Sequence, residues 1–324
     1  MLSPEQKARA EQLEATNGEQ DRPPFPLVWD NTMRSHFVSC PRKFQWEYGQ
    51  HWKSPWPNIH LHAGKAWASA LEAGRRAFYI DGKSEEDAHA AAYLKLVEEY
   101  GDFDSGKENK SLNRLGEALI YYFTAFPLST DPAKPYVGRN GPMIEFSFAL
   151  PLADDLLHPE TGEPIIYAGR ADMIATFAGA VTVYDDKTTS ALGASWAKQW
   201  DLRSQFSGYT WAAQQFGIHV TQVLVRGIAI LKTEIKHAQA ITGRPPHAVE
   251  RWHEQAVRDI RRAISCWKED YWDFNLAESC SSYGGCIFSH PCQSANPQEW
   301  IEGGNYIQKI WDPVNRTEET KEQP

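Results

Sequence analysis

The chain has 324 residues, of which 42% are hydrophobic and 12% aromatic, and its formal net charge at pH 7 is −9. This apolar content, with 13 tryptophans, excludes a disordered polymer and predicts a folded protein with a large core. The acidic charge argues against a protein that coats nucleic acid through a general excess of Lys and Arg, but it leaves room for a local basic groove.

The sequence lacks the features of membrane and secreted proteins. No apolar run approaches the roughly 20 residues of a membrane helix, and the first residues, "MLSPEQKARAEQLEATNGEQ", lack the apolar core of a secretion signal. We therefore expect a cytoplasmic protein that does not bind membranes. Thiols stay reduced in that compartment, so its five cysteines are better candidates for metal or cluster ligands than for disulfides.

The N-terminal third is predicted to be helical. Residues 1–26 are expected to form a polar appendage, with a solvated helix over 3–17 and a stiff break at "RPPFP". Two short helices follow, the first capped by Asp30 and the second beginning with Pro41. The amphipathic pattern over 62–80 and the helical composition of 84–125 complete a helical region that spans 27–135.

In the region 136–245 the spacing of apolar residues changes from that of helices to that of strands. We expect this region to be the catalytic core. Segments 143–152, 165–177 and 180–187 are predicted to form an antiparallel meander, with a tight reversal at "AGA". A helix over 195–216 and a strand over 221–231 follow. A long helix over 248–274 begins a C-terminal region of 246–312, and the charged tail 313–324 is expected to be disordered. The pattern indicates one α+β domain over 27–312, with a central mixed β-sheet flanked by helices.

Charged residues directly follow the apolar start of one predicted strand, in "VYDDKTTS" (183–190). A hairpin would bring Asp172 to the same end of the sheet as Asp185. With the backbone carbonyl of Asp186, these carboxylates would form an all-oxygen site of the kind that Mg²⁺ or Mn²⁺ prefers. Lys187 stands beside that site, where it could orient a water or stabilise negative charge at phosphorus. The pattern predicts phosphodiester hydrolysis.

The segments "GRADMIA", "VYDDKTT" and "QFSGY" resemble the motifs of the PD-(D/E)XK nuclease superfamily, in the RecB-like branch that includes AddB-type and CRISPR-associated nucleases. The resemblance covers roughly residues 30–292 and implies a restriction-endonuclease-like core. It implies that Asp172 and Asp185 bind metal and that Lys187 is catalytic. Glu145, on the preceding strand, is the candidate for a further acidic ligand.

A further family motif, Q-x3-Y, is matched by Gln205 and Tyr209. Residues four apart share one face of a helix, so this pair could reach DNA or the catalytic lysine together. One departure from the family is Ala68 in "GKAWASALE", which stands where many members carry a histidine.

The cysteines give an independent signal. Cys280, Cys286 and Cys292 are spaced C-x5-C-x5-C, and Cys40 lies far upstream. This arrangement is similar to that of RecB-like nucleases in which one N-terminal and three C-terminal cysteines hold a [4Fe–4S] cluster, although the family spacing is usually tighter. Thiolates would also bind zinc, for which His290 is a spare ligand, and free thiols are the third alternative. Cys266, on an amphipathic helix, is interpreted as core packing.

The sequence suggests three functions. The first is a Mg²⁺- or Mn²⁺-dependent deoxyribonuclease, in particular an exonuclease, that acts on single-stranded DNA or DNA ends during processing, recombination or repair, with an unknown helicase or recombination partner. The second is a degraded nuclease fold that binds DNA or acts as a scaffold, with a structural metal cluster. A redox protein would explain the cysteines but not the carboxylates.

Overall fold

A mixed seven-stranded sheet forms the centre of the molecule in the computed structural model, which describes residues 23–56, 58–103, 106–276, 278–281 and 285–320. The helix expected over 3–17 lies outside the described residues. The strands of the sheet are β1 (Val28–Trp29), β3 (Lys134–Pro135), β6 (Ile144–Pro151), β7 (Ile166–Phe177), β8 (Ala180–Thr189), β9 (Gln222–Ile230) and β10 (Ile235–Gly243). They run in the order β1-β7-β8-β9-β10, and β3 and β6 also pair with β7.

The predicted meander is confirmed, because β6, β7 and β8 pair in antiparallel succession. β8 then pairs in parallel with β9, and a crossover through α7 (Ala194–Lys198) and α8 (Ser204–Gln215) joins them. Parallel neighbours require such a crossover, so α8 is placed on a face of the sheet next to β8. The α+β architecture with a central mixed sheet flanked by helices is the one that the sequence predicts.

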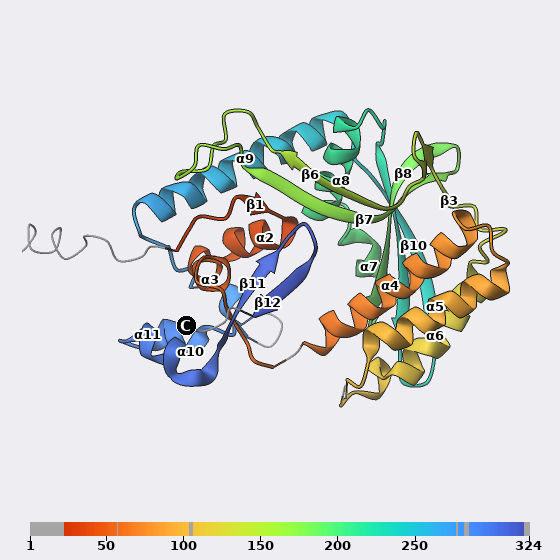
Figure 1. Cartoon of the computed structure of the whole chain (residues 1–324), viewed down its shortest axis with the longest axis horizontal. Helices are drawn as coiled ribbons and strands as arrows, with labels where there is room; N and C mark the ends of the chain where they lie inside the picture. The colour runs from red at the N-terminus through yellow and green to blue at the C-terminus, as the bar shows by residue number, and fades with distance from the viewer. Residues whose placement is uncertain (1–22, 57, 104–105, 277, 282–284, 321–324) are drawn as a thin grey trace, which may run out of the picture.

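Helices cover both faces of this sheet (Figure 1). On one face, α4 (Ile59–Tyr79), α5 (Glu85–Tyr100) and α6 (Leu112–Ala125) share a hydrophobic cluster with Ile228 and Ile230 of β9. On the other face, α2 (Asn31–Ser39), α8 and α9 (Pro246–Lys268) share a second cluster with β7. β8 therefore lies between two helical layers.

Local sequence explains the helical layer formed by α4, α5 and α6. Asn58, Ser84 and Ser111 each accept a hydrogen bond from a main-chain N–H of the first turn, which satisfies donors that have no partner inside the helix. Gly74 lets α4 approach its neighbours closely, because a Cβ there would lie 3.0 Å from Phe123 and 3.1 Å from Ala92. The close approach of α4 is therefore built into its sequence.

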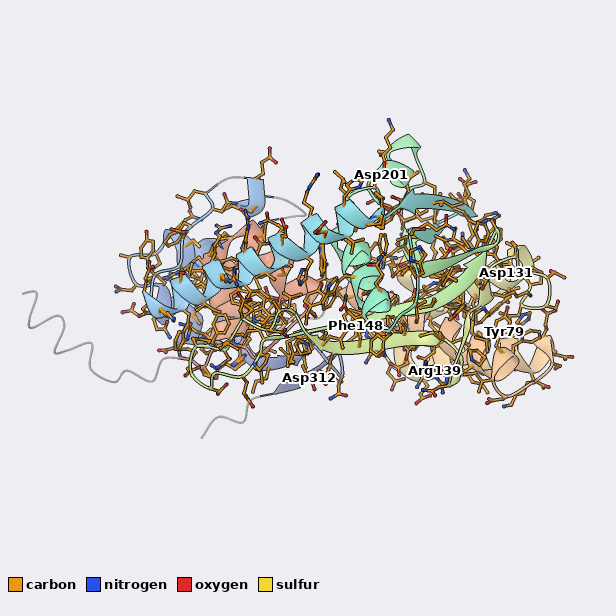
Figure 2. The ribbon with its side chains drawn as sticks, turned by 90° about the horizontal axis from the view of Figure 1, so that it is seen from above. Tyr79, Asp131, Arg139, Phe148, Asp201 and Asp312 are labelled. Carbon is orange, nitrogen blue, oxygen red and sulfur yellow. The ribbon has the colours of Figure 1, made fainter. Side chains whose placement is uncertain are left out.

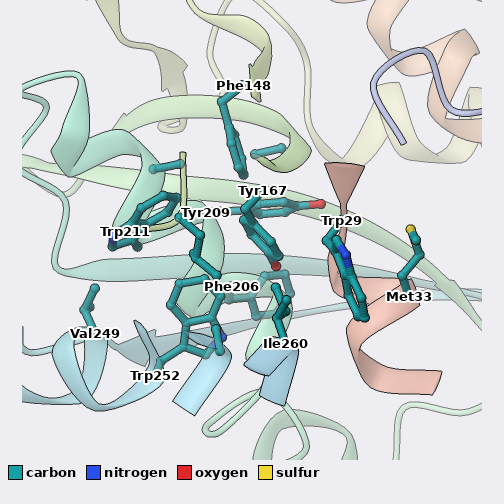
Figure 3. Packing of buried hydrophobic residues seen from close by; sticks show 14 of the residues in the cluster. Trp29, Met33, Phe148, Tyr167, Phe206, Tyr209, Trp211, Val249, Trp252 and Ile260 are labelled. Carbon is teal, nitrogen blue, oxygen red and sulfur yellow. The ribbon is translucent and has the colours of Figure 1, made fainter. Parts of the chain in front are cut away.

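The opposite layer is held by aromatic side chains, which Figure 3 shows around Tyr167 of β7. The ring of Trp252 on α9 lies 5.5 Å from that of Tyr167, in an edge-to-face arrangement. Gly208 brings α8 against both rings, because a Cβ there would lie 2.9 Å from Trp252 and 3.0 Å from the Tyr167 hydroxyl. Any side chain at position 208 would therefore push α8 away from β7 and α9.

The N-terminal segment corrects one predicted boundary. Asp30 caps α2 by accepting the N–H of Met33, and Pro41 begins α3 (Pro41–Phe44), as predicted. The polar appendage, however, does not extend to residue 26. The Phe25 ring is 3% exposed and packs in the core, and its N–H binds the Glu160 carboxylate.

The C-terminal tail is not wholly disordered, so that prediction is wrong for residues 313–320. β11 (Ile307–Asp312) and β12 (Thr317–Thr320) form a hairpin that pairs with β2 (Trp52–Lys53). The Asp312 carboxylate accepts the N–H groups of Val314 and Asn315, which organises the turn between the two strands.

Two further differences from the sequence analysis concern the core. The helix expected over 195–216 breaks between α7 and α8, where the Arg244 guanidinium binds the carbonyl of Trp200 at 2.7 Å and satisfies it outside a helix. β10 was missed because it is an edge strand in which polar and apolar residues are mixed and several side chains are exposed.

The remaining elements are short. They are β4 (Val137–Gly138), β5 (Gly141–Pro142), α10 (Ser289–Gln293), α11 (Pro297–Trp300) and the non-α helical turns Gln45–Gly49, Glu108–Lys110, Glu278–Cys280 and Ile301–Asn305. Within the described ranges, no helix is both long enough and apolar enough to cross a membrane.

Replacing Glu47 with Gln is expected to reduce the loss of stability in acid. Burial opposes the ionisation of Glu47, but hydrogen bonding and the charges of His36 and Lys53, at 2.9 and 3.0 Å, outweigh it and lower its pKa from 4.5 to about 2. Because the folded-state pKa is depressed, the ionised carboxylate stabilises the fold above pH 4.5, and this contribution is lost as the pH falls toward 2. A shift of this size corresponds to about 3 kcal/mol.

Urea denaturation at neutral pH and near pH 3 measures this contribution for the wild type and Glu47→Gln. Glu318→Gln, which alters a more exposed partner of Lys53, is the matched control. The wild type and control should lose more stability than Glu47→Gln on acidification. Equal losses in all three proteins would contradict the assignment.

Candidate metal and catalytic site

Two aspartates meet across the β7–β8 hairpin on the face covered by α8. The register pairs Met173 with Tyr184, so the next position places Asp172 opposite Asp185. The main-chain N–H of Asp186 donates to Oδ2 of Asp172 at 2.7 Å. The carboxylate of Asp172 therefore replaces a ladder partner of β8 and is tied directly to the segment that carries Asp185.

Both aspartates are in an environment that disfavours their negative charge. Burial raises the pKa of Asp172 to about 7, and the charge of Asp185 adds to this shift while Lys187 opposes it. Burial also raises the pKa of Asp185, against the attraction of Lys187. Two buried carboxylates that repel each other are stabilised by a bound cation, which removes the cost of ionising both.

Lys187 lies on the same side of β8 as Asp185, because residues two apart in a strand share a face. Its ammonium group is in ion-pair contact with Oδ1 of Asp185. Apart from that contact, this buried oxygen receives no hydrogen bond within the described part of the chain. Lys187 itself keeps 30% of its side chain exposed, so it can reach both the aspartates and a ligand from solvent.

Gln205 and Tyr209 lie on one face of α8, as predicted. Nε2 of Gln205 donates to the hydroxyl of Tyr209 at 2.7 Å. Tyr209 is buried among the aromatic side chains of the core (Figure 3). This burial raises its pKa, and the negative charge of Asp185 adds a smaller rise. The pair therefore presents neutral hydrogen-bonding groups near the carboxylates.

Glu145 of β6 lies opposite Asp172 in the register of β6 and β7, at a backbone position with φ of 55°. Its carboxylate pairs with Arg170 at 2.9 Å. Burial and a hydrogen bond with Glu72 of α4 raise its pKa to about 7. The structure thus places the Glu145 side chain in a second acidic pair with Glu72 of α4, whereas the charges that act most on Asp172 are those of Asp185, Lys187 and Asp186.

The residues fit a magnesium-like ion better than a metal that needs many protein ligands. Among the described residues, no group of three or more His, Cys, Asp or Glu side chains could hold a metal ion by itself. Mg²⁺ characteristically uses one or two carboxylates and completes its shell with waters and substrate phosphates. Asp172 and Asp185, with the poorly satisfied Oδ1 of Asp185, match that requirement.

The four predicted cluster cysteines line one cavity of about 330 Å³. Cys40 precedes α3, and Cys280, Cys286 and Cys292 come from the C-terminal segment. All four are free thiols. Burial raises the pKa of Cys292 to about 11, with the neighbouring Cys286 and Cys40 adding to the shift. Thiolates are the ligands that soft metals prefer, but in the described part of the chain these half-buried cysteines do not form a group that could hold a metal ion as they stand.

The other sulfur and histidine predictions concern residues near this cavity or in the core. His290 stacks on Trp300 with ring centroids 5.4 Å apart. Cys266 packs against the hydrophobic core, in agreement with its interpretation as a packing residue.

The sequence model of the PD-(D/E)XK nuclease superfamily matches residues 33–293. The chain belongs to this superfamily. It is also similar to a solved structure titled "Crystal structure of SSO0001", with 14% identity and a TM-score of 0.32 over 79% of this chain and 83% of that chain. The search of curated proteins returned no match.

Three charged residues of this PD-(D/E)XK protein were missed by the sequence analysis. Glu72 lies one helical turn after Ala68 on α4 and hydrogen-bonds Glu145. Arg75, one turn further, binds Asp186 from behind the strand at 2.5 Å. Arg316 lies at the β11–β12 turn, and its charge favours the ionised forms of Asp185 and Glu145. For Glu72 and Arg75, the only signal in the sequence was their helical spacing from Ala68. Arg316 had no such signal.

Proposed function

We propose that this chain is a Mg²⁺- or Mn²⁺-dependent DNA nuclease of the RecB-like branch, and that it acts as an exonuclease in DNA processing, recombination or repair. The observation that supports this most directly is the β7–β8 hairpin, where Asp172, Asp185 and Lys187 converge. This is the arrangement needed to bind a hard cation and a phosphodiester at the same place.

Asp172 and Asp185 would hold the metal, together with the backbone carbonyl of Asp186, and Glu145 would join them only by leaving its ion pair with Arg170. The bound ion would polarise the phosphate and lower the pKa of a water that attacks phosphorus. Lys187 moves from its ion pair with Asp185 to orient that water and to stabilise the negative charge that develops on the phosphate. The neutral Gln205–Tyr209 pair positions Lys187 and the DNA backbone through hydrogen bonds.

Two cations near the site suit a polyanionic substrate even though the whole chain is acidic. Lys187 is partly exposed, and Arg316 is an exposed residue whose charge reaches Asp185. With a metal bound, these two side chains would help to attract phosphates regardless of the net charge of −9.

The four-cysteine cavity is proposed to hold a [4Fe–4S] cluster. What supports this proposal is that four thiols, one N-terminal and three C-terminal, line a common cavity. A structural zinc ion is the alternative, and it would need the thiols to draw closer together.

The competing function is a degraded nuclease fold that binds DNA without cutting it. Ala68 favours this reading, because a half-buried methyl group stands where many relatives carry a histidine. The retained carboxylates, lysine and Gln205–Tyr209 pair favour hydrolysis.

Digestion of end-labelled DNA distinguishes these functions. The protein is incubated with linear and covalently closed circular DNA, single- and double-stranded, in Mg²⁺, Mn²⁺ or EDTA. An exonuclease should shorten linear DNA progressively from its ends, leave closed circles intact and lose all activity in EDTA. Cutting of closed circles would show that the protein is an endonuclease instead. DNA binding without cleavage in any metal would support the scaffold function.

A further inference from the structure

A buried polar network lies behind the candidate site, on the face of β8 that α4 and α6 cover. We call it the Arg75–Asp186 network. Its members are Arg75 of α4, Tyr122 of α6, Tyr184 and Asp186 of β8, Arg226 of β9 and Asp131. Figure 2 places Asp131 toward the same end of the molecule as Tyr79 of α4. None of these side chains has a role in the hydrolysis described above.

Asp186 is the most completely bonded member. Its Oδ2 pairs with the Arg75 guanidinium at 2.5 Å, and its Oδ1 accepts hydrogen bonds from the hydroxyls of Tyr122 and Tyr184, each at 2.9 Å. Arg75 also donates to Tyr122 at 2.7 Å. The side chains of Arg75 and Asp186 are 5% and 1% exposed. Asp186 is therefore held by side chains from α4, from α6 and from its own strand.

Stability alone is a poor explanation for this arrangement. Removing an Arg–Asp pair from water carries a large desolvation cost for each ion, and apolar residues of similar volume often serve a core equally well. A fully bonded buried pair does fix the relative position of the two elements that carry it, because its hydrogen bonds are satisfied in only one arrangement. The two elements here are α4 and the strand that carries Asp185 and Lys187.

The network reaches the candidate site through a single residue. Successive side chains of a strand point to opposite faces, so Asp186 points to α4 while Asp185 and Lys187 point to α8. The N–H of that same Asp186 donates to Oδ2 of Asp172. A displacement of Asp186 toward or away from α4 would therefore move the carboxylates of both Asp172 and Asp185.

We infer that the Arg75–Asp186 network is a positioning device for the divalent-cation site. Arg75 is a positioning residue that sets the place of Asp186, and Asp186 in turn sets the separation of the two metal-binding carboxylates. The inference rests on the proposed function, because it assigns this role to the same cation site.

The test replaces the pair by apolar residues, in the double variant Arg75→Met/Asp186→Leu, and measures Mn²⁺ binding by isothermal titration calorimetry without DNA. The apolar pair is expected to retain the fold, because no unpaired charge is left buried. The Kd for Mn²⁺ is expected to rise roughly 10-fold or more, as when residues that orient metal ligands are replaced.

A matched control removes another buried Arg–Asp pair. Arg34 of α2 contacts Asp259 of α9 at 2.7 Å, with side chains 9% and 2% exposed. This pair lies among the helices on the other face of the sheet, and Arg34→Met/Asp259→Leu should leave Mn²⁺ affinity within about 2-fold of the wild type, whatever it does to the melting temperature.

Tyr184→Phe keeps the test decisive if the double variant does not fold. It removes one hydrogen bond to Asp186 and keeps the aromatic ring, so a rise of roughly 3-fold in the Mn²⁺ Kd is expected with little change in packing. A rise in Kd for the network variants but not for the control supports the inference.

Wild-type affinity in the network variants, while the wild type binds Mn²⁺ and cuts DNA, would overturn the inference and leave the proposed function intact. A wild type that neither binds Mn²⁺ nor cuts DNA would overturn both.

Discussion

Replacing Asp185 with Asn is expected to abolish DNA cleavage without destabilising the fold. The substitution removes a charge from the proposed metal site, and a loss of roughly 1,000-fold or more in kcat is expected. The stability effect has the opposite sign, since burial raises the pKa of Asp185 and the ionised carboxylate therefore costs free energy in the folded state. In EDTA, the melting temperature of Asp185→Asn should equal or exceed that of the wild type.

Lys187→Met provides the comparison that separates chemistry from folding. It should lose cleavage as well, but it leaves the Asp185 carboxylate buried without its ion-pair partner and should lower the melting temperature in EDTA. Asp155→Asn, which alters an exposed ion pair with Arg261, is a control for general effects of removing an aspartate. Cleavage by Asp185→Asn at the wild-type rate, with the fold intact, would exclude this site as the catalytic centre.

The part of the site that the sequence predicts is the part set by local pattern. The alternation of β7 and β8 and the tight reversal between them are sufficient to bring Asp172 opposite Asp185, because side chains of paired strands meet at fixed intervals. The four-residue spacing of Gln205 and Tyr209 likewise fixes their common helix face. These predictions need only the nearest neighbour in the fold.

The surroundings of the site depend on contacts between distant segments. Arg75 and Asp186 are separated by 111 positions, and nothing in either local sequence indicates that they pair. Arg316 was assigned to a disordered tail because its segment is short and charged. The segment pairs with β11, and β11 in turn pairs with the distant strand β2 near the other end of the chain. Such long-range pairing is not encoded in local periodicity.

The cysteine cavity combines both kinds of information. The regular C-x5-C-x5-C spacing predicts three ligands that lie together, and only the distant Cys40 makes the set complete. The structure places Cys40 at the same cavity because α3 packs beside the C-terminal segment, where the N–H of Arg42 binds the carbonyl of Asp273 at 3.1 Å. The cavity therefore joins the beginning of the nuclease domain to its end.

Replacing Cys286 with Ala is expected to remove the metal from this cavity and to destabilise the whole fold. A metal bound by Cys40 and the three C-terminal cysteines would close a loop of about 250 residues, and its binding free energy would contribute to folding. Wild-type protein purified without oxygen should be brown, with broad absorption at about 400 nm and stoichiometric iron. Cys286→Ala should lose the colour and unfold at a lower temperature, because the loop is no longer closed.

Cys266→Ala is the matched control, because Cys266 packs against the core and does not line the cavity. It should keep the colour and the iron. Mn²⁺ binding without DNA should survive in both variants where they are folded, since Asp172 and Asp185 are positioned by the β7–β8 hairpin rather than by the cysteines. Colourless wild-type protein with stoichiometric zinc would replace the cluster by a zinc site, and protein without any bound metal would leave the four cysteines as packing residues of an apolar cavity.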